Sequence, residues 1–280
     1  MGKSVRETFR VPAEPDLKAI DPRGRPIGPK DKSAAADDMV DRGSRLDHLQ
    51  EALYAEATGG GRRVVLLVLQ GTDTSGKGGV IRHVGGLVNP QGLYIATFKK
   101  PTPEELAHPF LWRVRNQVPR PGFIGIFDRS HYEDVLIARV ESLVPEEVWR
   151  RRYDEINAFE AELTEKGVTV LKCMLHISPE EQAERLLARL DDPAKRWKYD
   201  PGDLDARAKW WEYMQAYVDA MRACDSDTAP WYVVPSDRKW YRNWAVAALL
   251  DETLTEMDPK FPEPDFDVDA ERARLASLVI

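Results

Sequence analysis

Residues 63–79, RVVLLVLQGTDTSGKGG, join two patterns that together predict a strand followed by a phosphate-binding loop. The first part, RVVLLVLQ, is a short continuous apolar run, as expected for a strand buried on both faces of a sheet. The second part places Gly71, Gly76 and Lys77 at the spacing of the loop G-x-x-x-x-G-K-[ST]. In such a loop, backbone N–H groups cradle phosphate oxygens and the lysine neutralises their charge. The alternative interpretation is a glycine turn that only joins a strand to a helix.

Short apolar runs alternate with helical stretches along the rest of the chain. Further strands are predicted over residues 94–98, 123–128, 168–177 and 231–234. Helices are predicted over residues 44–58, 77–88, 103–117, 131–140, 145–166, 179–190, 203–223 and 238–256. The repeated order of strand, helix and strand predicts an α/β fold with a parallel sheet and helices on both of its faces.

The composition is that of a globular protein with an acidic balance. The 280 residues are 42% hydrophobic and 31% charged, which is ample for a buried core. The net charge of -7 repels a nucleic-acid backbone, so we expect no nucleic-acid partner. The N-terminal segment lacks the apolar run of a secretion signal, and no stretch approaches the roughly 20 apolar residues of a membrane span. Cys173 and Cys224 show no metal-ligand spacing, which indicates reduced thiols in a cytoplasmic protein with no membrane partner.

The loop lacks one group that usually helps to bind magnesium. Gly78 stands where the usual pattern has a Ser or Thr hydroxyl, so Mg²⁺ needs oxygen ligands from elsewhere. Asp73 lies inside the loop, and Asp128 ends the predicted strand FIGIFD, at the position of a Walker B aspartate. We predict that both carboxylates bind the metal, with a helix N-cap as the alternative role of Asp128. Without side chains, Gly78 and Gly79 also permit a long anion chain to approach the backbone.

Arg129 follows Asp128 directly and is placed to stabilise the oxygens of a phosphoryl group during its transfer. Its alternative role is an ion pair with Glu133, four residues later on the next predicted helix. His131, in the same segment, is more typical of a hydrogen-bonding or surface residue than of a catalytic base.

A second group of cations lies between two predicted helices. The segment PAKRWKYDPGD, residues 193–203, contains Lys195, Arg196 and Lys198 around Trp197. In a P-loop kinase, a mobile lid at this place lowers cations onto the phosphates. Because residues 181–210 contain equal numbers of basic and acidic side chains, a solvated turn explains the segment equally well.

Four motifs in this order resemble the second family of polyphosphate kinases across roughly residues 45–257. They are GTDTSGKGG, FDRSHYEDV, DPAKRWKYDPGDLDARAKWWEYMQAY and PWYVVPSDRKWYRN. The resemblance implies a three-layer P-loop kinase fold like that of thymidylate kinase, with a central parallel sheet and a helical lid. It implies a phosphotransferase domain over residues 45–257, with the lid at about residues 185–225. Residues 1–44 would be an N-terminal arm and residues 258–280 an acidic extension.

The resemblance also implies the reaction and its cofactor. Members of this family transfer a terminal phosphoryl group between inorganic polyphosphate and nucleotides, with Mg²⁺ or Mn²⁺, and commonly form homo-oligomers, here a dimer or tetramer. The acceptors implied are AMP or ADP, with GMP and GDP as further candidates. Members that act on both mono- and diphosphates often have Asn where this chain has Asp128, which leaves the choice of acceptor open.

Carried over to this chain, the resemblance assigns roles to individual residues. The catalytic residues would be Asp73, Lys77, Asp128 and Arg129, with Asp73 and Asp128 as the metal ligands. The phosphate-contacting residues would be Thr74, Ser75, Gly76, Gly78, Gly79, Arg113, Lys195, Arg196, Lys198, Arg238, Lys239 and Arg242.

Two other classes of function fit parts of the pattern. An ATP-dependent kinase of nucleotides or small metabolites would share the fold, although Gly78 removes the hydroxyl that normally serves the nucleotide's magnesium. A catalytically silent phosphate-binding scaffold would not need two carboxylates beside its ligand, since these repel phosphate unless a cation lies between them. The sequence therefore favours the polyphosphate-dependent phosphotransferase.

Overall fold

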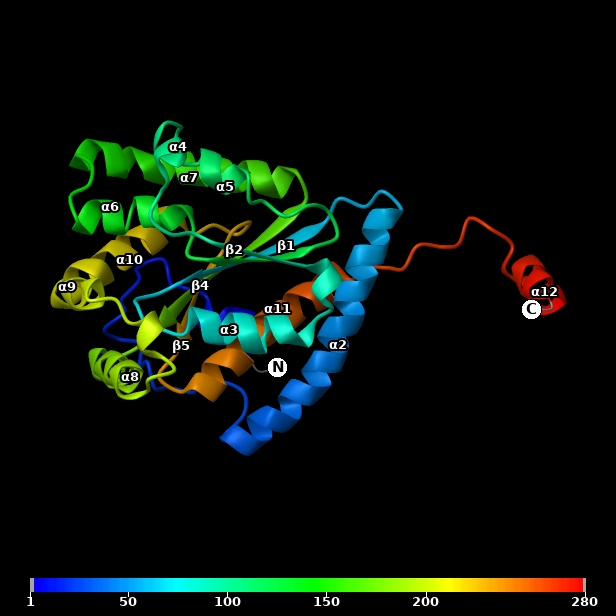
Figure 1. Ribbon diagram of the computed structural model, residues 1–280, viewed down its shortest axis with the longest axis horizontal. Helices are drawn as coiled ribbons and strands as arrows, with labels where there is room; N and C mark the ends of the chain where they lie inside the picture. The colour runs from blue at the N-terminus through cyan, green and yellow to red at the C-terminus, as the bar shows by residue number, and fades with distance from the viewer. Residues whose placement is uncertain (1–2, 279–280) are drawn as a thin grey trace.

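The computed structural model describes residues 3–278 and shows a parallel sheet between two layers of helices (Figure 1). The five strands lie in the order β2-β3-β1-β4-β5, and each neighbouring pair is parallel. Their bounds are β1 Val64–Gln70, β2 Leu93–Thr97, β3 Ile124–Asp128, β4 Val168–His176 and β5 Trp231–Pro235. All five strands predicted from the sequence are present, and the predicted parallel α/β fold is confirmed.

The helices of the described residues divide into α-helices and short 3-10 turns. The α-helices are α1 Val5–Phe9, α2 Lys32–Thr58, α3 Lys77–His83, α4 Pro103–Leu106, α5 Trp112–Arg115, α6 Ile137–Val140, α7 Glu146–Glu165, α8 Pro179–Asp191, α9 Gly202–Ala208, α10 Trp210–Cys224, α11 Lys239–Met257 and α12 Val268–Ser277. The 3-10 turns are η1 Gly85–Leu87, η2 Pro90–Gly92, η3 His131–Asp134 and η4 Arg196–Lys198.

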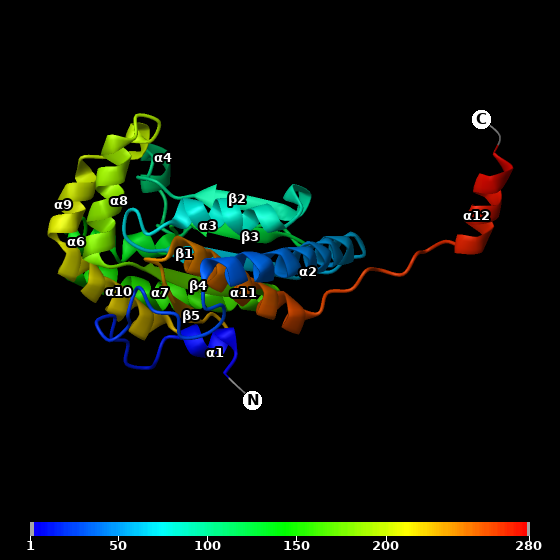
Figure 2. The same cartoon turned by 90° about the horizontal axis from the view of Figure 1, so that it is seen from below.

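The two faces of the sheet are covered by different helices. Helices α1, α2, α3 and α11 pack on one face, and α5, α6, α7 and α10 pack on the other (Figures 1 and 2). Side chains of a strand alternate between its faces, and β1 shows this clearly. The side chains of Val65, Leu67 and Leu69 pack in the core on the face covered by α1, α2, α3 and α11. Those of Val64, Leu66 and Val68 pack in the core on the opposite face. The apolar run in β1 is therefore continuous because both faces are buried.

The N-terminal residues are more regular than the sequence indicated. The helix predicted over residues 44–58 begins at Lys32, where Asp31 Oδ1 accepts a hydrogen bond from the Ala34 amide and caps the helix. The prediction missed this first part because SAAADD has no apolar periodicity. Ahead of it, α1 is closed by a capping box, and its Val5 and Phe9 are buried against the core.

Several predicted helices are interrupted. The stretch 103–117 forms two short helices, α4 and α5, with Pro109 in the segment between them. The stretch 203–223 is divided at Lys209 into α9 and α10, and the stretch 131–140 begins as a 3-10 turn. Helix α12, at the end of the acidic extension, stands apart from the rest of the molecule (Figures 1 and 2).

The lid region lies at one end of the sheet. Helices α8, α9 and α10 stand at the end where β1 leads into α3, which brings them beside the phosphate-binding loop (Figure 2). This is the edge at which the carboxyl ends of parallel strands meet, where ligands of α/β folds bind. Between residues 3 and 278, no helix combines the length and apolar character needed to cross a bilayer.

Candidate active site

The loop between β1 and α3 wraps around the side chain of its own lysine. Positive φ angles at Gly71, Thr74 and Gly76 turn the chain, and the value of 65° at Thr74 is unusual for a residue with a side chain. Lys77 Nζ donates to Gly71 O at 2.8 Å and to Thr72 O at 3.3 Å. The ammonium group is thus held inside the loop by two backbone carbonyls. Unusual backbone conformations of this kind cluster at ligand sites.

Three buried hydroxyl groups of the loop lack hydrogen-bond partners within the part of the protein that the structure describes. Thr72 Oγ1, Thr74 Oγ1 and Ser75 Oγ are each inaccessible to solvent and have no hydrogen-bond partner among residues 3–278. A buried polar atom without a partner costs free energy, so such atoms in native proteins call for an explanation. Hydroxyl groups can donate to phosphate oxygens and can also serve as oxygen ligands of a metal ion.

Asp73 and Asp128 are both close enough to the Lys77 ammonium to influence its ionisation. Burial lowers the pKa of Lys77, and the neighbouring Arg129 lowers it further, whereas both carboxylates act to raise it. Asp128 reaches this place because it is the last residue of β3 and pairs in register with Leu69 of β1. Both carboxylates thus act electrostatically on the loop lysine, and their roles in catalysis stay predictions.

These two carboxylates fit Mg²⁺ or Mn²⁺ in number and chemistry. No group of three or more His, Cys, Asp or Glu placed to hold a metal occurs in the described part of the chain. Mg²⁺ does not require one, because it is usually held by one or two carboxylates together with substrate phosphates and waters. Metal binding by Asp73 and Asp128 stays a prediction.

Arg129 joins the loop to the segment that follows β3. Its Nη2 donates to Asp73 Oδ1 at 2.7 Å, and its Nη1 donates to Glu133 Oε2 at 3.0 Å. The two carboxylates, Glu133 first, raise the pKa of Arg129 above its ordinary value. The ion pair with Glu133 that the sequence offered as an alternative is thus present together with a contact to the loop. Like Thr74, Arg129 has a φ of 65°, so the backbone here is strained.

The glycines of the loop have different neighbours. A Cβ atom on Gly76 would lie 1.7 Å from Arg242 Nη1, and one on Gly79 would lie 2.5 Å from Arg242 Nη2. A Cβ atom on Gly78 would meet no described atom within 4 Å. The space beside Gly79 is therefore filled by an arginine, and the open approach to the backbone expected at both glycines exists only at Gly78.

Two buried arginines support the loop from outside. Arg185, on α8, donates to the carbonyl oxygens of Thr74, Ser75, Ser236 and Asp237 at 2.7 to 3.1 Å. Arg242, on α11, donates to Ser75 O at 3.2 Å, and burial together with Arg185 lowers its pKa to about 10. Arg185 does not stand out in the sequence, because an arginine on an amphipathic helix gives no local sign that it is buried.

Helices of the lid region also contact the loop directly. Gln182 Nε2, on α8, donates to Asp73 O at 3.3 Å, and Tyr217, on α10, accepts a hydrogen bond from the Gly71 amide at 3.1 Å. Asp203, on α9, is near enough to Asp73 that burial and this carboxylate raise its pKa to about 6. Gln182 and Asp203 did not stand out in the sequence, since their roles depend on how the lid packs.

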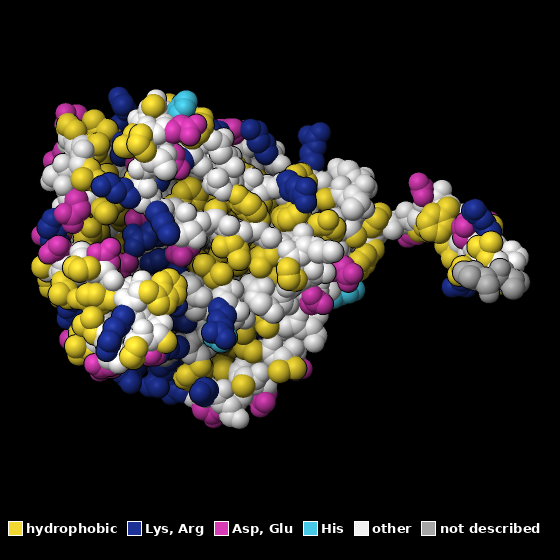
Figure 3. Space-filling model, viewed as in Figure 1, with side chains coloured by type: hydrophobic (Ala, Val, Ile, Leu, Met, Phe, Trp, Pro, Cys, Tyr) yellow, Lys and Arg dark blue, Asp and Glu magenta, His cyan; other side chains and the backbone are white. Residues whose placement is uncertain are grey.

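The predicted lid cations lie on the surface. Lys195, Arg196 and Lys198 are exposed, and Lys195 Nζ forms an ion pair with Asp192 at 2.7 Å. Burial lowers the pKa of Lys239, and Arg185, Arg242 and Lys195 lower it further. Arg185, Arg242 and Lys195 thus each act electrostatically on Lys239. Figure 3 shows Lys and Arg side chains gathered on the side of the molecule where the lid and the start of α3 lie.

Two other predicted phosphate contacts are engaged with protein groups. Arg113 is buried and donates to Lys99 O at 2.9 Å and to Asp134 Oδ2 at 3.4 Å. Arg238 donates to Arg23 O at 3.1 Å, next to the start of α11. Contacts of both residues with phosphate stay predictions.

Comparisons with known proteins agree with this geometry. A family model described as polyphosphate kinase 2 matches residues 30–262. A Meiothermus ruber protein named AMP/ADP-polyphosphate phosphotransferase is 48% identical over 250 residues, which are 89% of this chain and 92% of that protein. A Rhodopseudomonas palustris protein named ADP-polyphosphate phosphotransferase is 41% identical over 231 residues, 78% of each chain.

A solved structure is similar over nearly the whole chain. The crystal structure of polyphosphate kinase 2 from Arthrobacter aurescens has a TM-score of 0.96 and 46% sequence identity, covering 99% of this chain and 98% of its own. The three-layer P-loop kinase fold expected from the sequence is thereby confirmed.

Proposed function

The chain belongs to the polyphosphate kinase 2 family, and from this we propose that it transfers a phosphoryl group between inorganic polyphosphate and a nucleoside mono- or diphosphate. The relatives named above act, by their names, on AMP and ADP. A less similar relative from Corynebacterium glutamicum, 34% identical, is named a putative GDP-polyphosphate phosphotransferase. AMP and ADP are therefore the first acceptors to test, and GMP and GDP follow.

One observation carries the proposal: the loop surrounds a buried ammonium group with three buried hydroxyls that lack partners. Phosphate oxygens are acceptors that match both the hydroxyl donors and the cation. Asp73 and Asp128 distinguish this site from one that only binds phosphate, because carboxylates repel phosphate unless a cation lies between them.

The residues of the site act by positioning and electrostatics. An oxygen of the nucleotide's terminal phosphate forms a bond to the terminal phosphorus of polyphosphate, and the bridging P–O bond to the shortened chain breaks. The electron pair of that bond leaves with the shortened chain. Lys77 and Arg129 offset the charge on the transferred group, and Lys195, Lys239 and Arg242 attract the polyanion. Because the attacking oxygen is already anionic, the step requires no covalent enzyme intermediate and no strong base.

Asp73 and Asp128 are the residues that would hold Mg²⁺ or Mn²⁺. The bound metal would supply charge neutralisation between the phosphate oxygens. Arg129 Nη2 donates to Asp73 Oδ1 at 2.7 Å and thereby restricts the orientation of that carboxylate.

The proposal extends to the organisation and setting of the protein. We propose a catalytic unit of residues 45–257 with the lid at about residues 185–225, followed by the extension of residues 258–280. Residues 1–44 precede this unit, and α1 and the first part of α2 within them pack against its core. We place the enzyme in the cytoplasm, where its nucleotide substrates are found, as a homo-oligomer of two or four chains. The buried thiols of Cys173 and Cys224 agree with a reducing compartment.

The proposal is tested by comparing phosphoryl donors and acceptors in one assay. Purified protein with Mg²⁺ and long-chain polyphosphate is incubated with AMP, ADP, GMP or GDP, and the products are separated by chromatography. We expect ADP or ATP to form from the adenine nucleotides only when polyphosphate and Mg²⁺ are both present. ATP as donor to AMP or to small metabolites serves as the comparison. Transfer from ATP with none from polyphosphate would instead indicate an ATP-dependent kinase, and binding of polyphosphate without turnover would indicate a scaffold.

A further inference from the structure

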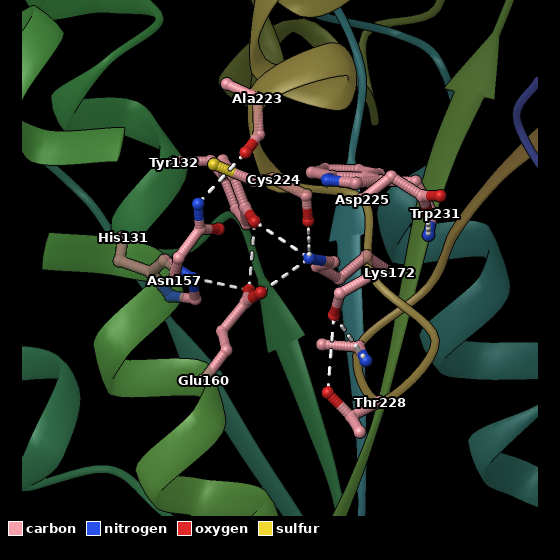
Figure 4. Close-up of polar contacts among 12 residues, drawn as sticks. His131, Tyr132, Asn157, Glu160, Lys172, Ala223, Cys224, Asp225, Thr228 and Trp231 are labelled. Carbon is pink, nitrogen blue, oxygen red and sulfur yellow. Dashed lines mark hydrogen bonds and ion pairs between the residues drawn. The ribbon is translucent and has the colours of Figure 1, made fainter. Parts of the chain in front are cut away.

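A fully buried ion pair lies beneath the active site, between α7 and β4 (Figure 4). Lys172 Nζ lies 2.5 Å from Glu160 Oε2, and neither residue is more than 2% exposed. The ammonium group also donates to Tyr132 Oη at 3.0 Å and to Cys224 O at 2.6 Å. All three protons of the lysine thus have acceptors on different elements, namely α7, η3 and α10.

The other oxygen of Glu160 binds the segment that follows Arg129. Glu160 Oε1 accepts a hydrogen bond from Tyr132 Oη at 2.9 Å and lies 3.1 Å from His131 Nε2 (Figure 4). Two consecutive side chains of η3 are therefore fixed by one carboxylate. Each of them is buried, and the Tyr132 ring packs edge-on against Trp231 of β5.

Stability alone does not account for this arrangement. Burying two charges has a desolvation cost that their attraction often fails to exceed, and apolar replacements of such pairs are frequently neutral or stabilising. A buried pair with five polar contacts does restrict the orientation of the elements that it joins.

Hydrogen bonds connect the ion pair to the loop. Ser130 lies between Arg129 and His131, and its Oγ accepts from the Tyr132 amide at 3.2 Å and from Gln70 Nε2 at 3.1 Å. Gln70 is the last residue of β1, directly before the loop. Glu160 is thus linked through the side chains of η3 to Arg129, which lies two residues before His131 in the chain. It is also linked to the start of the loop through the hydrogen bond between Ser130 and Gln70.

Helix α10 is attached to the same structure at two points. Near its middle, Tyr217 accepts the hydrogen bond from the Gly71 amide. At its end, the carbonyl of Cys224 is one of the last carbonyls without a partner in the helix, and Lys172 satisfies it. Helix α10 is thus joined by hydrogen bonds both to the loop and to the buried ion pair.

We propose that Glu160 and Lys172 are positioning residues for phosphoryl transfer, holding Arg129, the loop and the base of lid helix α10 in one geometry. They act through His131, Tyr132 and Cys224 and do not touch the reacting groups. The kinetic test of this inference depends on the proposed function, whereas the tests by melting temperature and hydrogen exchange do not.

The test compares Glu160→Gln, Lys172→Met and the double variant with the wild type. Glu160→Gln leaves the buried Lys172 ammonium without its charged partner, and Lys172→Met leaves the buried Glu160 carboxylate without its charged partner. The melting temperature of each single variant should therefore fall. The double variant contains no buried charge at this place, so its melting temperature should recover above that of either single variant. We expect its kcat to stay about tenfold or more below the wild type, with KM for nucleotide and polyphosphate within about threefold, because misplacement acts mainly on the transition state.

A matched control and a milder variant accompany this series. Asp251 of α11 is also a buried carboxylate, paired with Arg42 and Arg45 of α2 on the opposite side of the sheet. Asp251→Asn should lower the melting temperature while leaving kcat within about twofold, since no active-site residue depends on it. If the single variants do not fold, Tyr132→Phe keeps the ring and removes only the hydroxyl that touches both charges; its kcat should fall by about threefold or more.

Hydrogen exchange measures the positioning without any assay of activity. Peptides covering residues 71–79 and 127–135 should exchange faster in the double variant and in Tyr132→Phe, and at the wild-type rate in Asp251→Asn. A double variant whose kcat and exchange both return to wild-type values would overturn the inference. If the wild type forms no product from polyphosphate, the proposed function is wrong. The hydrogen-exchange rates of residues 71–79 and 127–135 then still decide whether Glu160 and Lys172 hold these segments in place.

Discussion

The glycines of the loop show how much single residues of the same type can differ in this site. Gly76 combines a positive φ of 111° with the guanidinium of Arg242 against its α-carbon. Gly78 faces open space, although the usual loop pattern has its hydroxyl residue there. The sequence identifies both as loop glycines, but only the packing of α11 shows which of them is sterically required.

Alanine substitutions should separate the two positions. Gly76→Ala forces a side chain into a strained backbone conformation and against a buried arginine, so we expect the melting temperature to fall by about 5 °C or more. Gly78→Ala should change it by about 1 °C or less, because nothing has to move. Thermal unfolding followed by circular dichroism measures both. Equal destabilisation by the two substitutions would show that the loop packs differently.

At the scale of elements, strands were easier to predict than helices. Each strand is a short apolar run whose two faces are buried, so the signal lies in the run itself. Helix α2 begins earlier than predicted because its first residues, SAAADD, are held by the Asp31 cap and carry no apolar stripe. The loop, Asp128 and Arg129 could be located from local motifs. Arg185, Gln182 and the pair of Glu160 with Lys172 could not, since their burial arises from the packing of distant elements.

The stability that Glu160 of α7 contributes through its ion pair with Lys172 of β4 should decrease as the pH falls. Burial alone would raise the pKa of Glu160, but Lys172 and His131 outweigh it and lower the pKa below the ordinary value of 4.5. A carboxyl with a lowered pKa in the folded state contributes stability above pH 4.5, and this contribution is lost as pH falls through the folded-state pKa.

The double variant Glu160→Gln, Lys172→Met lacks this group and provides the reference. We expect the wild type to lose more unfolding free energy than the double variant between about pH 5 and the acid limit of folding, as measured by urea unfolding at each pH. If the unfolding free energies of the two proteins change equally with pH, the pKa of Glu160 is the same in the folded and unfolded states, and this prediction is wrong.

At the scale of the whole molecule, the acidic extension is the part least connected to the fold. Its first residues pack on α2, where Phe261 lies 5.5 Å from His48 between ring centres. Every residue of α12 is exposed, and the helix is shorter than those that are stable alone in water. Within residues 3–278, the catalytic domain therefore owes none of its packing to α12.

Removal of α12 should leave the catalytic domain intact. A chain that ends after residue 266 is expected to keep its melting temperature within about 1 °C and its kcat within about twofold, because residues 267–278 are all exposed. Light scattering of both chains measures whether the assembly changes. A large loss of stability together with a smaller assembly would mean that α12 packs on another copy of the chain.

The central claim is that the buried ammonium of Lys77 acts on the phosphoryl group transferred from polyphosphate. Its most direct test is the initial rate of ATP formation from ADP, polyphosphate and Mg²⁺ by the wild type and by Lys77→Met, with thermal unfolding of both proteins. We predict a rate loss of about a thousandfold or more in a variant that remains folded, because the transferred charge loses a buried cation. A folded Lys77→Met protein that forms ATP within tenfold of the wild-type rate would contradict the account.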